Sequence, residues 1–119
     1  MSTCQILLLE DEPLILMDLE FAAEDHGCAP MPTTNLEQAL AVLDSGQDIT
    51  VAVLDFSLPQ GKNCLPVAQR LEERGIPYIL HSGDLDRQDE AIHGLAAKLI
   101  AKPACAKRVI GAAMDLVAA

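Results

Sequence analysis

Short apolar runs alternate with segments of helical periodicity along this chain, and that alternation constrains the fold more than any other feature. Between the runs, apolar side chains recur every three or four residues, which is typical of helices with one buried face. Strands that alternate with helices in this way indicate a parallel sheet covered by helices. We therefore predict an α/β fold with a doubly wound, five-stranded parallel sheet and helices on both faces.

The five predicted strands span residues 4–9, 28–33, 49–54, 76–80 and 98–101. The run at 49–54 is almost continuously apolar, as expected of a central strand that is buried on both faces. The run at 28–33 is the weakest because Pro30 and Pro32 have no amide hydrogen to donate to a neighbouring strand. We expect this strand to be irregular and to lie at an edge of the sheet.

Helix boundaries can be predicted from capping residues. The first helix should start near Glu12 and Pro13 and end at Gly27. The segment Thr34–Glu37 fits a capping box, which predicts a second helix that stops near residue 45. Three further helices are expected: one ending at Gly75, a short polar one within 84–94, and a last one over 104–117.

Chemically active side chains follow the predicted strands. Glu10 and Asp11 come after the first strand and Asp55 after the third, while Ser82 and Lys102 follow the fourth and fifth. Because parallel strands end at one edge of the sheet, these five side chains should meet there. Taken singly, the acids could be a solvated turn or helix cap, Ser82 a simple turn and Lys102 a solvated side chain.

Together, these residues point to phosphoryl chemistry. Clustered carboxylates repel one another unless a cation is present, and hard oxygen ligands suit Mg²⁺. A hydroxyl and an ammonium group can neutralise a transferring phosphoryl group, and a carboxylate such as Asp55 can attack phosphorus. We therefore predict a metal-binding acid cluster in which Asp55 is also a candidate nucleophile.

Composition restricts the class of protein. The 119 residues are enough for one domain, which we assign to residues 1–119, and with 3% aromatic residues its core must be aliphatic. A net charge of −10 disfavours nucleic acids and anionic lipids as partners. No apolar run reaches the length of a membrane span, and residues 1–4 lack the basic start of a signal peptide. We expect a cytoplasmic protein without membrane contact.

The cysteines and histidines suggest no further site. Cys4, Cys28, Cys64 and Cys105 form no CxxC pair, and no histidine lies at metal-ligand spacing, so zinc is disfavoured. We predict four reduced thiols, as expected in a reducing compartment. His81 precedes Ser82, and we expect it to be an ordinary residue at a strand end.

Four segments in order resemble the landmarks of bacterial response-regulator receiver domains: Leu7–Pro13, Leu54–Gly61, His81–Gly83 and Ala101–Pro103. Each motif alone is weak, but the four together in this order are a strong signal, and the resemblance covers the whole chain. The resemblance implies a flavodoxin-like sheet with strand order 2-1-3-4-5. It also implies a role in two-component or phosphorelay signalling.

By this resemblance, Asp55 is the phosphoacceptor, and Ser82 and Lys102 contact the phosphoryl group. Mg²⁺, or Mn²⁺ in its place, would bind Glu10, Asp11, Asp55 and the backbone carbonyl of Ser57. A histidine kinase or histidine phosphotransfer protein would supply the phosphate, and an unknown downstream protein would respond. Such a protein is a phosphoacceptor that dephosphorylates itself slowly, and it is not a multiple-turnover enzyme.

Some positions depart from the family pattern. Leu99 stands where a switch aromatic is usual, Gly83 follows Ser82, and Ala104 and Cys105 follow Pro103. These departures resemble a minority group of stand-alone receivers without the usual aromatic switch. They leave open a binding module that does not depend on phosphorylation. A metal-dependent phosphohydrolase is a third reading, disfavoured because Ser57 replaces the second acid that one such family carries.

Overall fold

The computed structural model describes residues 4–82, 98–102 and 104–117. Its five strands form one parallel sheet in the order β2-β1-β3-β4-β5. The strands are β1 (Gln5–Leu9), β2 (Ala29–Thr33), β3 (Val51–Leu54), β4 (Tyr78–Ser82) and β5 (Lys98–Ala101). This confirms the predicted doubly wound α/β fold and its strand order.

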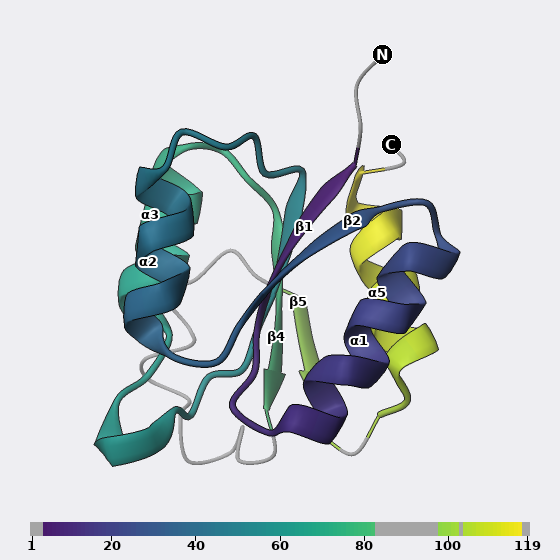
Figure 1. The fold of residues 1–119 in the computed structure, drawn as a ribbon, viewed down its shortest axis with the longest axis horizontal. Helices are drawn as coiled ribbons and strands as arrows, with labels where there is room; N and C mark the ends of the chain where they lie inside the picture. The colour runs from purple at the N-terminus through teal and green to yellow at the C-terminus, as the bar shows by residue number, and fades with distance from the viewer. Residues whose placement is uncertain (1–3, 83–97, 103, 118–119) are drawn as a thin grey trace.

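Helices cover both faces of the sheet (Figure 1). The helices α2 (Leu36–Asp44) and α3 (Leu65–Glu73) lie on one face, and α1 (Pro13–Asp25) and α5 (Ala106–Val117) lie on the other. A short 3-10 helix, η1 (Pro59–Gly61), lies between β3 and α3. The start of β1 and the end of α5 lie at one end of the sheet, and the strands have their carboxyl ends at the opposite end.

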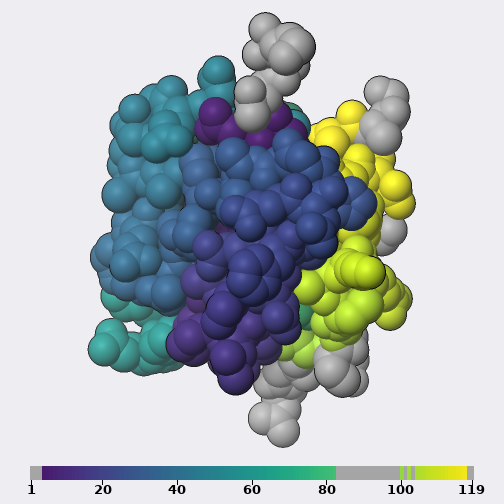
Figure 2. Space-filling view, turned by 45° about the vertical axis from the view of Figure 1, so that its right-hand side comes forward, coloured from purple at the N-terminus to yellow at the C-terminus, as the bar shows by residue number. Residues whose placement is uncertain are grey.

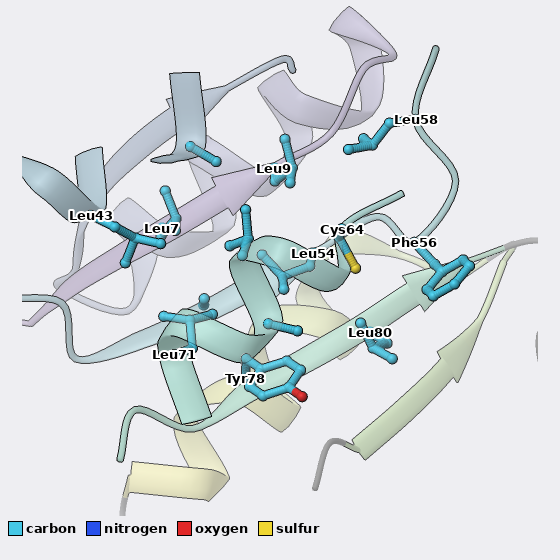
Figure 3. Close-up of a cluster of buried hydrophobic side chains, with 14 residues drawn as sticks. Leu7, Leu9, Leu43, Leu54, Phe56, Leu58, Cys64, Leu71, Tyr78 and Leu80 are labelled. Atoms are coloured by element: carbon cyan, nitrogen blue, oxygen red, sulfur yellow. The ribbon is translucent and has the colours of Figure 1, made fainter. Parts of the chain in front are cut away.

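Alternate residues of β1, β3 and β4 face opposite layers of an aliphatic core. Leu7 and Leu9 pack toward α2 and α3 in the cluster of Figure 3, where Phe56 and Tyr78 add aromatic rings. Ile6 and Leu8 pack on the other side, against α1 and α5. Because β1 is buried on both faces, its sequence is a continuous apolar run and does not alternate between apolar and polar residues.

The helix boundaries largely agree with the prediction. Helix α1 begins with a proline, and Gly27 follows it with φ +80°, a left-handed conformation that glycine adopts without steric cost. The predicted capping box is wrong by one residue: Asn35 caps α2 by accepting a hydrogen bond from the Gln38 amide. Glu37 instead forms an ion pair with Lys62 at 3.0 Å.

Strand β2 lies at the edge of the sheet as predicted, but it is not irregular. All five of its residues pair in register with β1. The amide of Ala29 donates to Cys4 and the carbonyl of Thr33 accepts from Glu10, so alternate residues face β1. Pro30 and Pro32 fall on the intervening positions, where the missing amides would have pointed away from the sheet.

The prediction of four reduced thiols is wrong for two of them, because Cys4 and Cys28 form a disulfide. These cysteines directly precede the paired residues Gln5 and Ala29, which brings their Cα atoms to 4.6 Å. Cys64 is a buried free thiol and Cys105 an exposed one.

The last helix begins at Ala106, two residues later than predicted. The helix predicted within 84–94, together with Gly83 and Pro103, lies outside the described residues. Over the part of the chain that the structure describes, no helix combines the length and the apolarity that crossing a membrane requires.

Candidate functional site

Three carboxylates gather where β1 and β3 end. Glu10 directly follows β1 and Asp55 directly follows β3, and the Asp55 amide donates to the Leu9 carbonyl at 2.8 Å. Glu10, Asp11 and Asp55 each offer an oxygen atom within 4.8 Å of the others. The pairing of β1 with β3 therefore brings together acids that are more than forty residues apart.

The three acids of this cluster are buried to different degrees. Glu10 is 1% exposed and Asp55 5% exposed, whereas Asp11 lies closer to the surface. One Glu10 oxygen accepts a hydrogen bond from the amide of Glu12 at 3.1 Å, which holds the side chain in place. Two nearly buried carboxylates side by side are costly, so the site favours a bound cation.

Lys102 supplies one positive charge. Its Nζ atom lies 3.0 Å from Glu10 Oε1 and 3.3 Å from Asp55 Oδ2. The Lys102 amide donates to the Ser82 carbonyl at 3.0 Å, which places the residue just beyond β5 and beside the end of β4. Among the described residues, Lys102 contacts two carboxylates of a cluster of three, so negative charge remains in excess there.

The pKa values reflect this imbalance. Burial, followed by the charge of Glu10, raises the pKa of Asp55 to about 8, although the charge of Lys102 opposes both effects. Burial alone would lower the pKa of Lys102, but the hydrogen bond to Glu10 and the charge of Asp55 leave it raised. Lys102 therefore stays charged, and Asp55 readily takes up a proton when no cation is bound.

The cluster fits a divalent metal ion. Its donors are hard carboxylate oxygens from three residues, which is the ligand chemistry that Mg²⁺ and Ca²⁺ accept. The raised pKa of Asp55 points the same way, because a cation that replaces the proton would relieve the repulsion from Glu10.

Two further predicted site residues lie at the same carboxyl ends of the strands. Ser82 is the last residue of β4, is 1% exposed and pairs in register with Ala101. Ser57 lies two residues beyond Asp55 and forms an isolated bridge with Asn63. The assignment of the Ser57 carbonyl as a metal ligand stays a prediction.

His81 lies near the end of β4, as predicted, and its side chain is buried. It is 2% exposed and lies on the α1 and α5 side of the sheet, where it lines a cavity with Lys102. Burial, followed by the nearby charge of Lys102, lowers its pKa to about 4, so its imidazole is neutral at pH 7. The available signal was a polar residue inside the apolar run that starts at Tyr78.

Comparison with family models and with curated proteins finds no match for this sequence. Solved structures do match. SdrG from Sphingomonas melonis Fr1 is 33% identical, with a TM-score of 0.79, and the match covers 100% of both chains. A response regulator receiver protein from Sinorhizobium medicae WSM419 is 25% identical, with a TM-score of 0.88, over 99% of this chain and 97% of that one.

A further solved structure shares the fold of this chain at lower sequence identity. A CheY-like receiver domain protein from Methanospirillum hungatei JF-1 has a TM-score of 0.82 at 19% identity, over 98% of this chain and 94% of that one. The acids and the lysine described above lie at the carboxyl edge of this shared fold, where open α/β sheets carry their sites.

Proposed function

Since the chain belongs to the response regulator receiver domains, we propose that it takes up a phosphoryl group on Asp55 in a two-component or phosphorelay pathway. One observation carries this proposal. The buried Asp55 carboxylate lies between two acids that can hold a cation and a lysine whose Nζ atom is 3.3 Å away. This arrangement supplies a nucleophile together with the positive charge that a phosphoryl group requires.

In the proposed reaction, a carboxylate oxygen of Asp55 attacks the phosphorus of a phosphohistidine. The new O–P bond forms as the N–P bond breaks, and the imidazole nitrogen keeps the electron pair of the broken bond. Lys102 stays close to the accepting oxygen and balances part of the charge on the phosphoryl group. Ser82 can donate its hydroxyl to a phosphoryl oxygen from the end of β4.

Glu10, Asp11 and Asp55, with the carbonyl of Ser57, would hold Mg²⁺ or Mn²⁺. A bound ion would neutralise phosphoryl oxygens and favour the ionised form of Asp55. Glu10 can orient Lys102 as well, because the two side chains are in contact at 3.0 Å. The acids therefore act as ligands, and Asp55 alone has the additional role of acceptor.

We expect the phosphorylated form to act through protein contacts. A histidine kinase or histidine phosphotransfer protein would deliver the phosphate, and a downstream protein would recognise the changed surface. Lys102 and Ser82 connect the site to β4 and β5, so a shift of either would move the ends of these strands. Position 99 in β5, which pairs with Leu80, is a leucine. The switch therefore cannot be transmitted by an aromatic side chain at this position.

The test is phosphorylation by a small donor. Wild type, Asp55→Asn and Asp48→Asn, a substitution at an exposed acid, are incubated with acetyl phosphate and Mg²⁺ and examined as intact proteins by mass spectrometry. Wild type and Asp48→Asn should gain one phosphoryl group, while Asp55→Asn or added chelator should prevent it. If Asp55→Asn gains the group as readily as wild type, the acceptor is misassigned.

A further inference from the structure

Three sulfur atoms lie together at the amino ends of the strands, at the end of the sheet opposite the acid cluster. Cys4 precedes β1, Cys28 precedes β2, and Met114 belongs to α5. The Met114 thioether lies 3.5 Å from Cys28 Sγ, and all three side chains belong to the core on the α1 and α5 side of the sheet. Figure 2 shows this part of the surface, where the purple start of β1, the blue segment from α1 to β2 and the yellow end of α5 lie together. The third sulfur atom distinguishes this place from an ordinary disulfide.

The backbone holds the two cysteines side by side whether or not the disulfide is closed. Gln5 pairs with Ala29, and the Ala29 amide donates to the Cys4 carbonyl at 2.8 Å. The Cys28 amide donates to the Ala23 carbonyl at 2.9 Å, near the end of α1. Because Cys4 is partly exposed, a reductant can reach the disulfide, and the two thiols would stay close to each other after reduction.

The chemistry of the three sulfur atoms selects a class of metal ion. Thiolates and thioethers are soft ligands, which favour Cu⁺ over hard divalent ions. Zn²⁺ normally takes four ligands from thiolate, imidazole and carboxylate groups, and a thioether is not among them. Iron–sulfur clusters are held mainly by thiolates, usually four of them. Two thiolates and one thioether therefore suit Cu⁺ best.

The charges nearby suit the complex that these ligands would form. One Cu⁺ ion with two thiolates carries a single negative charge. Met114 also lines a groove of about 470 Å³ along α5, and the same groove is lined by Lys107 and Arg108 together with Asp115. The groove therefore gives an ion a path to the sulfur atoms, and it places more positive than negative side chains near a complex of negative charge.

We propose that reduction of the disulfide between Cys4 and Cys28 opens a binding site for one Cu⁺ ion, which is held by the two thiolates and by the thioether of Met114. In the reduction, a dithiol passes two electrons and two protons to the cysteines, the S–S bond breaks, and the dithiol closes to a disulfide of its own. Binding of Cu⁺ then releases the two thiol protons to solvent, and the ion keeps its oxidation state. The site is separate from Asp55 and does not depend on its phosphorylation.

The test compares the reduced protein with its disulfide form. All proteins carry Cys105→Ser, because Cys105 is an exposed free thiol, whereas Cys64 is buried. The disulfide is opened with a water-soluble phosphine, which takes oxygen from water and becomes its oxide, and the phosphine is then removed without air. Titration with the coloured Cu⁺ complex of bicinchoninate measures uptake. The reduced protein should take up one Cu⁺ per chain with an affinity that rises with pH, and the disulfide form should take up none, since the thiolate is the metal ligand.

Variants assign the ligands. Cys28→Ser should abolish uptake. Loss of a group one shell outside a metal site weakens binding by about 10–100-fold, so Met114→Leu, which removes a ligand, should weaken it at least about tenfold. Met17→Leu, at a methionine of α1 that is 43% exposed, should bind Cu⁺ as the Cys105→Ser protein does. X-ray absorption should find three sulfur neighbours of the copper ion in the Cys105→Ser protein and two after Met114→Leu, a difference that a change in packing would not produce.

Several results would overturn the proposal. No uptake by the reduced protein, equal uptake by the reduced and disulfide forms, or tighter binding of Zn²⁺ than of Cu⁺ would each overturn the site. Unchanged affinity with three sulfur neighbours in Met114→Leu would overturn the role of Met114. The comparison of the reduced and disulfide forms needs no substitution at the site, so it is decisive even if Cys28→Ser does not fold.

Discussion

Replacing Asp55 with asparagine should stabilise the metal-free protein at neutral pH. In the folded state, burial and then the charge of Glu10 raise the pKa of Asp55 to about 8, while an unfolded aspartate titrates near 3.9. The folded protein therefore holds a proton on Asp55 over a pH range in which the unfolded chain has lost it. The contribution of Asp55 to the stability of the folded protein therefore falls as the pH rises from about 4 to about 8.

The size of the effect follows from the gap between the two pKa values. Each pKa unit corresponds to about 1.4 kcal/mol, so about three units between pH 4 and pH 7 set an upper bound of about 4 kcal/mol. Relaxation of the site and entry of water reduce such penalties, and we expect about 1–3 kcal/mol at pH 7. Asparagine has nearly the same shape and does not titrate, so Asp55→Asn removes the penalty while Lys102 keeps its contact with Glu10.

The assay is urea unfolding in chelator at pH 4, 5, 6, 7 and 8, with wild type, Asp55→Asn and Asp48→Asn compared at each pH. The free energy of unfolding of Asp55→Asn should exceed that of wild type by an amount that grows with pH and is near zero at pH 4. Asp48 is exposed, so its variant should follow wild type throughout. A difference for Asp55→Asn that is negative, or that does not change with pH, would refute the reasoning.

Three other results are expected. Mg²⁺ should raise the melting temperature of wild type more at pH 8 than at pH 5, because it competes with the proton on Asp55, and a pH-independent rise in a thermal melt would contradict this. Reduction of the disulfide between cysteines 24 residues apart should lower stability by roughly 3 kcal/mol in urea unfolding, and a Cys28→Ser variant should lose this dependence on reductant. Leu54→Ala should cost about 2–5 kcal/mol, because Leu54 is fully buried in the central strand, whereas Leu14→Ala, at a residue 74% exposed, should change unfolding by less than about 0.5 kcal/mol.

Much of the site could be predicted because strand ends are readable from a sequence. The apolar runs before Glu10 and Asp55 end where β1 and β3 end, Ser82 is the last residue of β4, and parallel strands have their carboxyl ends at one side of the sheet. The prediction did not require knowledge of which strands are neighbours. The contact of Lys102 with both Glu10 and Asp55 does require it, since it depends on the pairing of β4 with β5 and on the direction of a long side chain.

The sequence did not predict the features that depend on the pairing register of the strands. The disulfide forms because Cys4 and Cys28 precede two paired residues, and no local pattern gives the register of parallel strands. The prolines of β2 suggested an irregular strand, but the alternation of hydrogen bonds places both at the open side. Likewise, the N-terminal cap of α2 was predicted at Thr34 but is Asn35. Either side chain could accept the hydrogen bond that the first turn of a helix offers, so the sequence did not decide between them.

The most direct test of the account is to locate the phosphoryl group on the chain. After reaction with acetyl phosphate and Mg²⁺, borohydride reduces an aspartyl phosphate to homoserine, and peptide sequencing by mass spectrometry identifies the converted residue. The account predicts homoserine at position 55, dependent on both the phosphodonor and Mg²⁺. Conversion at another acid, such as Asp11, or a phosphorylated protein in which position 55 remains aspartate, would contradict it.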